Sequence, residues 1–72
     1  MTMIKSDFEI ETRDEGDTVL YTPNSYPAID WCRKNLASCV RWGRSYMMPA
    51  KRGKSLRGHL AHKEGFTIAV GA

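Results

Sequence analysis

Hydrophobic residues change their spacing several times within this chain of 72 residues, and these changes constrain the fold more than any other feature. Between Asp7 and Glu11 every second residue is apolar, which is the pattern of a strand with one buried face. Ile29, Cys32 and Leu36 instead follow helical spacing. Both periods in so short a chain predict a small α+β domain.

Turn residues, prolines and caps divide the chain into elements. Residues 13–17 have turn chemistry, Pro23 and Pro49 end strands, and Asn24 or Ser25 caps a helix. Residues 39–48 are either a hairpin at Gly43 or one bent strand, and the hairpin is favoured. The predicted elements are strands over 7–11 and 18–22, a helix from the cap to Leu36, the hairpin, a helix over 50–64 capped by Gly65, and a strand over 66–70. Gly53 and Gly58 disfavour helix, so the first turn of the second helix is expected to be a loop.

The expected fold class is a two-layer α+β domain of order β-β-α-β(β)-α-β. Two helices on one face of a mostly antiparallel sheet would bury all the apolar stripes together. Residues 1–72 form one domain, because a chain of this length has too little material for a second core.

The composition favours a cytosolic protein without a membrane segment. No apolar run approaches the roughly 18 residues that a membrane span needs, and Met1 to Ile10 lacks the pattern of an export signal. Small secreted folds carry more cysteines than the two in this chain, Cys32 and Cys39. Two free thiols are therefore expected.

Charge is divided unevenly along the chain. Residues 1–32 hold seven acids and two bases, a net charge of −5, whereas residues 33–72 hold nine bases and one acid, a net charge of +8. Such asymmetry favours a surface that attracts an oppositely charged partner.

Two charged groups are the candidate binding residues. The basic group is Arg41, Arg44, Lys51, Arg52, Lys54, Arg57 and Lys63, and the aromatic side chains Trp42 and Tyr46 lie among its members in sequence. The acidic group is Glu9, Glu11, Asp14, Glu15 and Asp17. Bases between aromatics suit RNA or single-stranded DNA, whereas the acids could imitate phosphates or meet a basic protein. Core packing of the aromatics and simple solvation of the charges are the alternatives.

Motifs for catalysis or cofactors fail on spacing. Gly53-Lys54-Ser55 ends like a phosphate-binding loop, but the required first glycine is Met48. Cys32 and Cys39 are too far apart for zinc, and His59 and His62 are too close together. With no room for a catalytic pocket, neither enzymatic activity nor a metal or cofactor is expected.

The run from Phe8 through Gly16-Asp17-Thr18-Val19-Leu20-Tyr21-Thr22-Pro23 to Ala28-Ile29-Asp30-Trp31 resembles small proteins encoded by phages and prophages. Such proteins often open with a hairpin, a Thr-Pro and a helix that carries Trp. The resemblance implies a role like that of inhibitors of host defences, anti-CRISPR proteins among them, which plug a protein or nucleic-acid surface. It assigns no functional residue.

The leading hypothesis is a non-catalytic protein that docks on a larger host protein or nucleoprotein complex in the host cytosol and modulates or inhibits it. A second is direct nucleic-acid binding through the basic segment 51–63. A third is a homo-oligomeric subunit, such as a homodimer paired through an exposed sheet edge.

Overall fold

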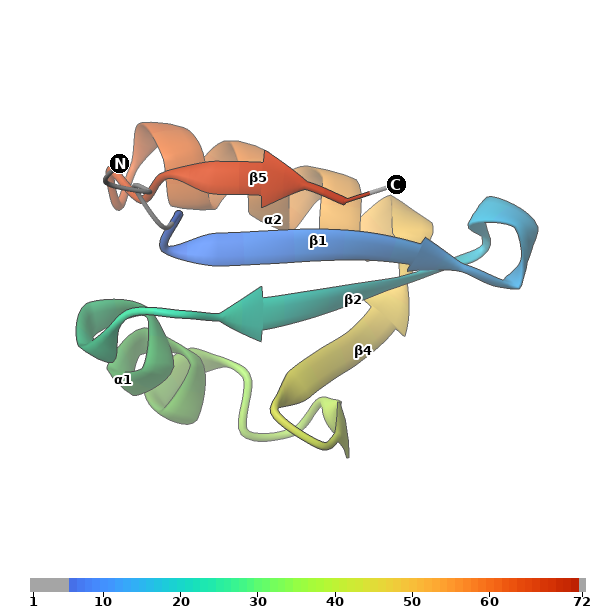
Figure 1. Cartoon of the computed structure of the whole chain (residues 1–72), viewed down its shortest axis with the longest axis horizontal. Coiled ribbons are helices and arrows are strands. Elements are labelled where there is room, and N and C mark those ends of the chain that lie inside the picture. Colours follow the sequence, from blue (N-terminus) through green and yellow to red (C-terminus); the bar gives the residue numbers. More distant parts are fainter. Residues whose placement is uncertain (1–5, 72) are drawn as a thin grey trace, which may run out of the picture.

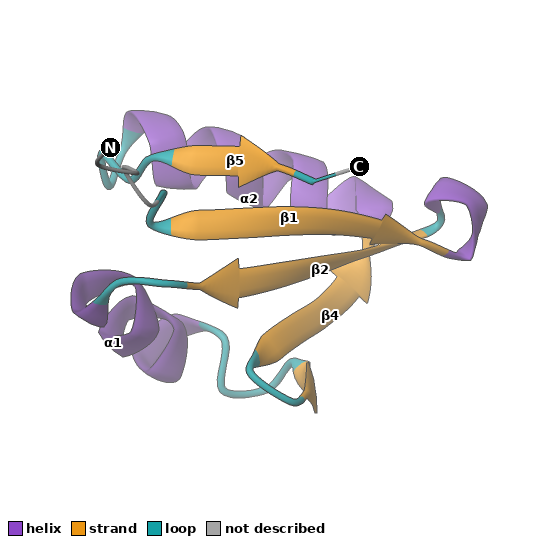
Figure 2. Cartoon of the chain, in the orientation of Figure 1, coloured by secondary structure: helices purple, strands orange, loops and turns teal. Residues whose placement is uncertain are grey.

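The computed structural model describes residues 6–71, and its elements follow the predicted order (Figures 1 and 2). They are β1 (Phe8–Arg13), a short 3₁₀ turn η1 (Asp14–Gly16), β2 (Thr18–Pro23), α1 (Tyr26–Asn35), β3 (Val40–Trp42), β4 (Ser45–Pro49), α2 (Ala50–His62) and β5 (Ile68–Val70). Residues 1–5 lie outside the described part of the chain. They include Lys5 and the first half of the segment 1–10, in which no export signal is expected.

The strands form one five-stranded sheet in the order β3-β4-β2-β1-β5. Only β5 pairs in parallel, with β1, and the other neighbours are antiparallel. β3 and β4 pair as a hairpin around Gly43, which has a φ of +62°. The α+β class, the mostly antiparallel sheet and the hairpin are therefore confirmed.

The hydrophobic core lies on one face of the sheet, and both helices cover that face. Phe8, Ile10, Tyr21, Tyr46 and Met48 project from the strands. They meet Ala28, Cys32 and Leu36 from α1 and its C-cap, and Leu60 from α2. In Figure 1, α2 passes behind β1 and β5, which leaves the front of the sheet without a helix. This face of the sheet, opposite the one that carries Phe8, Ile10 and Tyr21, is called the open face.

Helix α1 begins where the capping residues predicted. Ser25 is the N-cap, and its hydroxyl accepts a hydrogen bond from the Ala28 N–H at 3.3 Å. The first turn also holds Pro27, where the missing N–H costs nothing. Trp31 packs at the edge of the core, with its ring centroid 5.9 Å from that of His59 on α2.

Helix α2 differs from the prediction at both ends. Its first turn is helical and directly follows β4, so the prediction of a loop in the first turn is wrong. Gly53 is buried against β2 at a position where a Cβ would overlap the Val19 methyl group, so this glycine lets α2 approach β2 closely. The helix ends at His62, two residues before the predicted end. Gly65 follows with a φ of +74°, in the conformation expected of the glycine that ends a helix.

Candidate interaction surfaces

Exposed bases lie along helix α2 and at its C-cap, and the helix itself contains no acidic residue. Gly53 and Leu60 are buried against the sheet. All five lysine and arginine side chains of the segment 51–63 are exposed. These residues are called the α2 patch: Lys51, Arg52, Lys54, Arg57 and Lys63.

The α2 patch has no carboxylate partner among residues 6–71. The ion pairs in that part of the chain are Arg13–Glu11 at 3.3 Å and Lys34–Asp30 at 2.9 Å, and His59 contacts Glu64 at 3.2 Å. None of them includes a lysine or arginine of the patch. Its charge is therefore available to an external anion.

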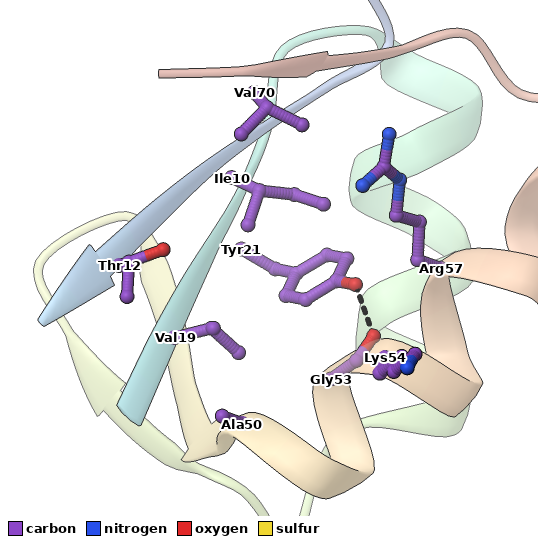
Figure 3. A pocket seen from close by; sticks show the side chains of 9 residues that line it. All are labelled: Ile10, Thr12, Val19, Tyr21, Ala50, Gly53, Lys54, Arg57 and Val70. Carbon is purple, nitrogen blue, oxygen red and sulfur yellow. Dashed lines mark hydrogen bonds between the residues drawn. The ribbon is translucent and has the colours of Figure 1, made fainter. Parts of the chain in front are cut away.

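A hollow of about 250 Å³ lies between α2 and the sheet (Figure 3). The aliphatic side chains of Ile10, Val19 and Val70 line it on the sheet side, and Lys54 and Arg57 line it on the helix side. This hollow joins apolar surface to part of the α2 patch.

Tyr21 lines the hollow and connects β2 to α2 by a hydrogen bond. Its hydroxyl donates a hydrogen bond to the Gly53 carbonyl (Figure 3). Burial raises the pKa of Tyr21 to about 12, although the charge of Arg57 acts in the opposite direction. The hydroxyl therefore remains a donor even at a pH at which an ordinary tyrosine ionises.

The acidic candidates are divided between two places. Register puts Glu9 and Glu11 on the open face, because each pairs with a β2 residue whose side chain points away from the helices. Asp14 and Glu15 lie in η1, and Asp17 follows it. Glu11 is neutralised in part by Arg13, so the acidic group does not form one continuous surface comparable to the α2 patch.

The open face carries an apolar cluster that the strand alternation near Asp7 to Glu11 does not indicate. Leu20 is only 1% exposed although it points away from the core, and Met47 pairs with it in register. Val40 and Trp42 lie further along this face and are 65% and 52% exposed. The unbroken apolar run Val19-Leu20-Tyr21 was the available signal, because it gives β2 apolar side chains on both faces.

The predicted grouping of aromatic side chains with the basic segment is wrong. Tyr46 is 2% exposed and belongs to the core, and the Arg41 guanidinium lies 4.5 Å from its ring centroid. Trp42 lies on the open face, away from α2, with the Arg13 guanidinium 4.6 Å from its ring centroid. Arg44 donates a hydrogen bond to the Pro23 carbonyl at 3.4 Å. Tyr46 is thus not free to stack on a base, and Trp42 does not assist the α2 patch.

The two cysteines of the mis-spaced zinc pattern differ in burial. Cys32 is buried, Cys39 is half-buried, and both are free thiols. Burial raises the pKa of Cys32 to about 12, so its thiol is protonated at neutral pH. Within residues 6–71 no three His, Cys, Asp or Glu side chains come close enough together to hold a metal ion.

No helix in the described part of the chain is long and apolar enough to cross a membrane. Comparison of the chain with family models, with curated proteins and with solved structures finds no match. A function for this chain therefore has to be argued from its own surfaces.

Proposed function

We propose that this protein is a non-catalytic binding protein that docks through the α2 patch on an anionic surface of a larger protein or nucleoprotein complex in its host's cytosol. One observation carries the proposal: α2 exposes its bases on a helix without acids, and no carboxylate among residues 6–71 pairs with them. A charged surface of one sign attracts and orients a partner of the opposite sign. Resemblance to phage-encoded proteins makes inhibition of the host complex the proposed consequence.

Gly58 supports contact on the outer side of α2. A glycine inside a helix costs about 1 kcal/mol relative to alanine. Nothing lies within 4 Å of the position that a Cβ of Gly58 would occupy, so packing within the described chain does not require this glycine. Lys51, Ser55 and His62 are exposed at helical spacing from it. Contact between a partner and the helix backbone, between these side chains, would require a glycine at residue 58.

Charge reversal on α2 tests the proposal. The variant Lys51→Glu/Arg52→Glu/Lys54→Glu places acids in the first turns of α2, where the helix dipole favours them, so the fold is expected to persist. A control, Arg33→Glu/Lys34→Glu/Arg44→Glu, changes the net charge equally on other surfaces. Because it places acids in the last turn of α1 and breaks the Lys34–Asp30 ion pair, circular dichroism first verifies that it is folded. Host proteins captured by the wild type are quantified by mass spectrometry for each variant. The α2 variant should lose the partner and the control should keep it; equal capture by both would overturn the proposal.

A steric variant separates docking from net charge. Gly58→Leu adds a side chain on the outer side of α2 where space is open, so the helix is expected to remain folded. Capture of the same partner should weaken although the charge is unchanged. Undiminished capture would show that the partner does not approach this part of the helix.

Direct nucleic-acid binding is the second candidate, because the α2 patch extends along a helix about 20 Å long, which can follow several phosphates. Fluorescence polarisation with labelled single- and double-stranded DNA and RNA tests it. Binding through phosphates would weaken steeply with salt, and the triple reversal on α2 would reduce the salt slope by roughly three. The absence of binding at low salt would contradict this candidate.

A further inference from the structure

Among residues 6–71, no strand pairs with the outer edge of β5. β5 is the last strand of the sheet, and among the described strands it pairs only with β1. The Phe8 N–H donates to the Thr67 carbonyl at 3.0 Å, and the Gly71 N–H donates to the Ile10 carbonyl at 2.7 Å. Since alternate residues of a parallel strand point their backbone groups toward the neighbouring strand, those of Ile68 and Val70 point outward.

The hollow adjoins this edge. Val70 is 55% exposed, and its side chain points to the helix side of the sheet because it is in register with Ile10. Figure 3 shows Val70 and Ile10 on one side of the hollow and Arg57 and Lys54 on the other. A side chain entering here would meet an aliphatic surface first and two cations next.

We propose that an extended segment of a partner protein adds to β5 as a sixth strand and directs acidic side chains toward Lys54 and Arg57. This inference rests on the proposed function and names the chemistry of its partner. An added strand would use the outward backbone groups of Ile68 and Val70, as in recognition by strand addition. The two methylenes of a glutamate would cover Val70, and the carboxylates of the segment would pair with Arg57 and Lys54.

The other face of the added strand restricts the sequence of the segment. Side chains alternate between the two faces of a strand, so every second residue of the segment would lie on the open face. There it would lie in the same row across the sheet as Ala69 and Glu9, which pair in register. Acids at these positions would approach Glu9, so the segment should alternate acidic residues with neutral, β-branched ones.

The opposite edge of the sheet does not offer the same site. On β3, Val40 and Trp42 point to the open face, and Arg41 is stacked on Tyr46. The hollow lined by Lys54 and Arg57 also includes Val70 in its lining, so it lies at the β5 side of the sheet. β3 therefore provides a matched control edge.

Two labelled peptides of equal composition test the inference by fluorescence polarisation. In one, Glu and Thr alternate over nine residues; in the other, all the Glu residues precede all the Thr residues. The alternating peptide should bind about tenfold more tightly, because it alone keeps acids away from Glu9 while pairing with Lys54 and Arg57. Equal affinity would overturn the inference, as would binding of labelled single-stranded DNA at this site without binding of the alternating peptide.

Variants at the edge separate strand addition from charge attraction. Val70→Pro removes an N–H that points away from β1, so the pairing with β1 should persist while affinity falls about tenfold. Val70→Asp provides a second variant of the same position, and Val40→Asp is its control on the other edge. Only the substitutions at Val70 should weaken binding of the alternating peptide, and the amide resonances of Ile68 and Val70 should shift on binding to the wild type.

The outcomes also separate this inference from the proposed function. Unchanged peptide affinity in both Val70 variants would overturn strand addition, and the proposed function would still stand if reversal of the α2 patch abolished partner capture. If both α2 reversal and the Val70 variants left capture of the partner unchanged, the proposed function and the inference would both fail.

Discussion

Asp7 joins the beginnings of β1 and β5 at the scale of single residues. Its carboxylate accepts hydrogen bonds from the Thr67 N–H at 3.0 Å and the Thr67 hydroxyl at 3.2 Å, and its own N–H donates to that hydroxyl at 3.0 Å. The Thr67 backbone N–H is the main cause that lowers the pKa of Asp7 from its ordinary value of 3.8, with a further contribution from the Ser25 side chain.

We predict that the contribution of Asp7 to stability is lost in acid. A carboxylate whose pKa is lowered by folding stabilises the fold above its unfolded pKa, and this stabilisation disappears as the pH falls below about 4. Asp7→Asn should therefore lower the free energy of unfolding by about 1 kcal/mol at pH 7, and the difference from the wild type should be smaller at pH 2. Urea denaturation at both pH values measures this. Glu15→Gln, in the exposed turn, is the control, and a constant difference at both pH values would contradict the prediction.

The two cysteines are expected to differ in reactivity, because a thiolate is the reacting species. Cys32 is buried and its pKa is raised to about 12, whereas Cys39 is half-buried. A thiol reagent at pH 8 should modify Cys39 quickly and Cys32 only after urea unfolds the protein. Cys39→Ser should abolish the fast phase. Fast modification of both cysteines in the native protein would contradict the buried position of Cys32.

At the scale of elements, the two glycines within α2 have opposite surroundings. A Cβ at residue 53 would overlap Val19, whereas a Cβ at residue 58 would meet open space. Gly53→Ala should destabilise the protein by roughly 1–3 kcal/mol through overpacking. Gly58→Ala should stabilise it by about 1 kcal/mol through helix propensity. Thermal denaturation followed by circular dichroism measures both.

A double variant identifies the cause of the effect at Gly53. If overlap with Val19 is responsible, Gly53→Ala should cost less in a Val19→Ala background than in the wild type. An equal cost in both backgrounds would assign the loss to helix α2 itself.

At the scale of the whole molecule, part of the charge division along the sequence becomes a division between layers. The α2 patch lies in the helical layer, while Glu9 and Glu11 lie on the open face of the sheet. A polyanion should therefore respond to where a charge lies as well as to the net charge. Elution from immobilised heparin measures this. The triple reversal on α2 should elute at a lower salt concentration than Arg33→Glu/Lys34→Glu/Arg44→Glu, and identical elution would mean that net charge alone decides.

Local rules predicted the elements because their causes lie within a few residues. Alternation predicted β1, the Ser25 cap and the apolar stripe predicted α1, and Gly43 marked the β3–β4 hairpin. The same rules were wrong for the first turn of α2. Helix propensity penalises Gly53, but its close contact with Val19 on β2 reverses the local preference.

The sequence by itself determined the fold class, the division of charge and the absence of the spacings that a phosphate loop or a zinc site needs. Only the tertiary structure decided which side chains share a surface. Trp42 and Tyr46, close in sequence to the bases, lie on the open face and in the core respectively, because strand register sends them to opposite sides of the sheet. Val70 and Arg57 meet at one hollow because β5 pairs with β1 above α2. Such contacts depend on strand order, which local sequence patterns do not encode.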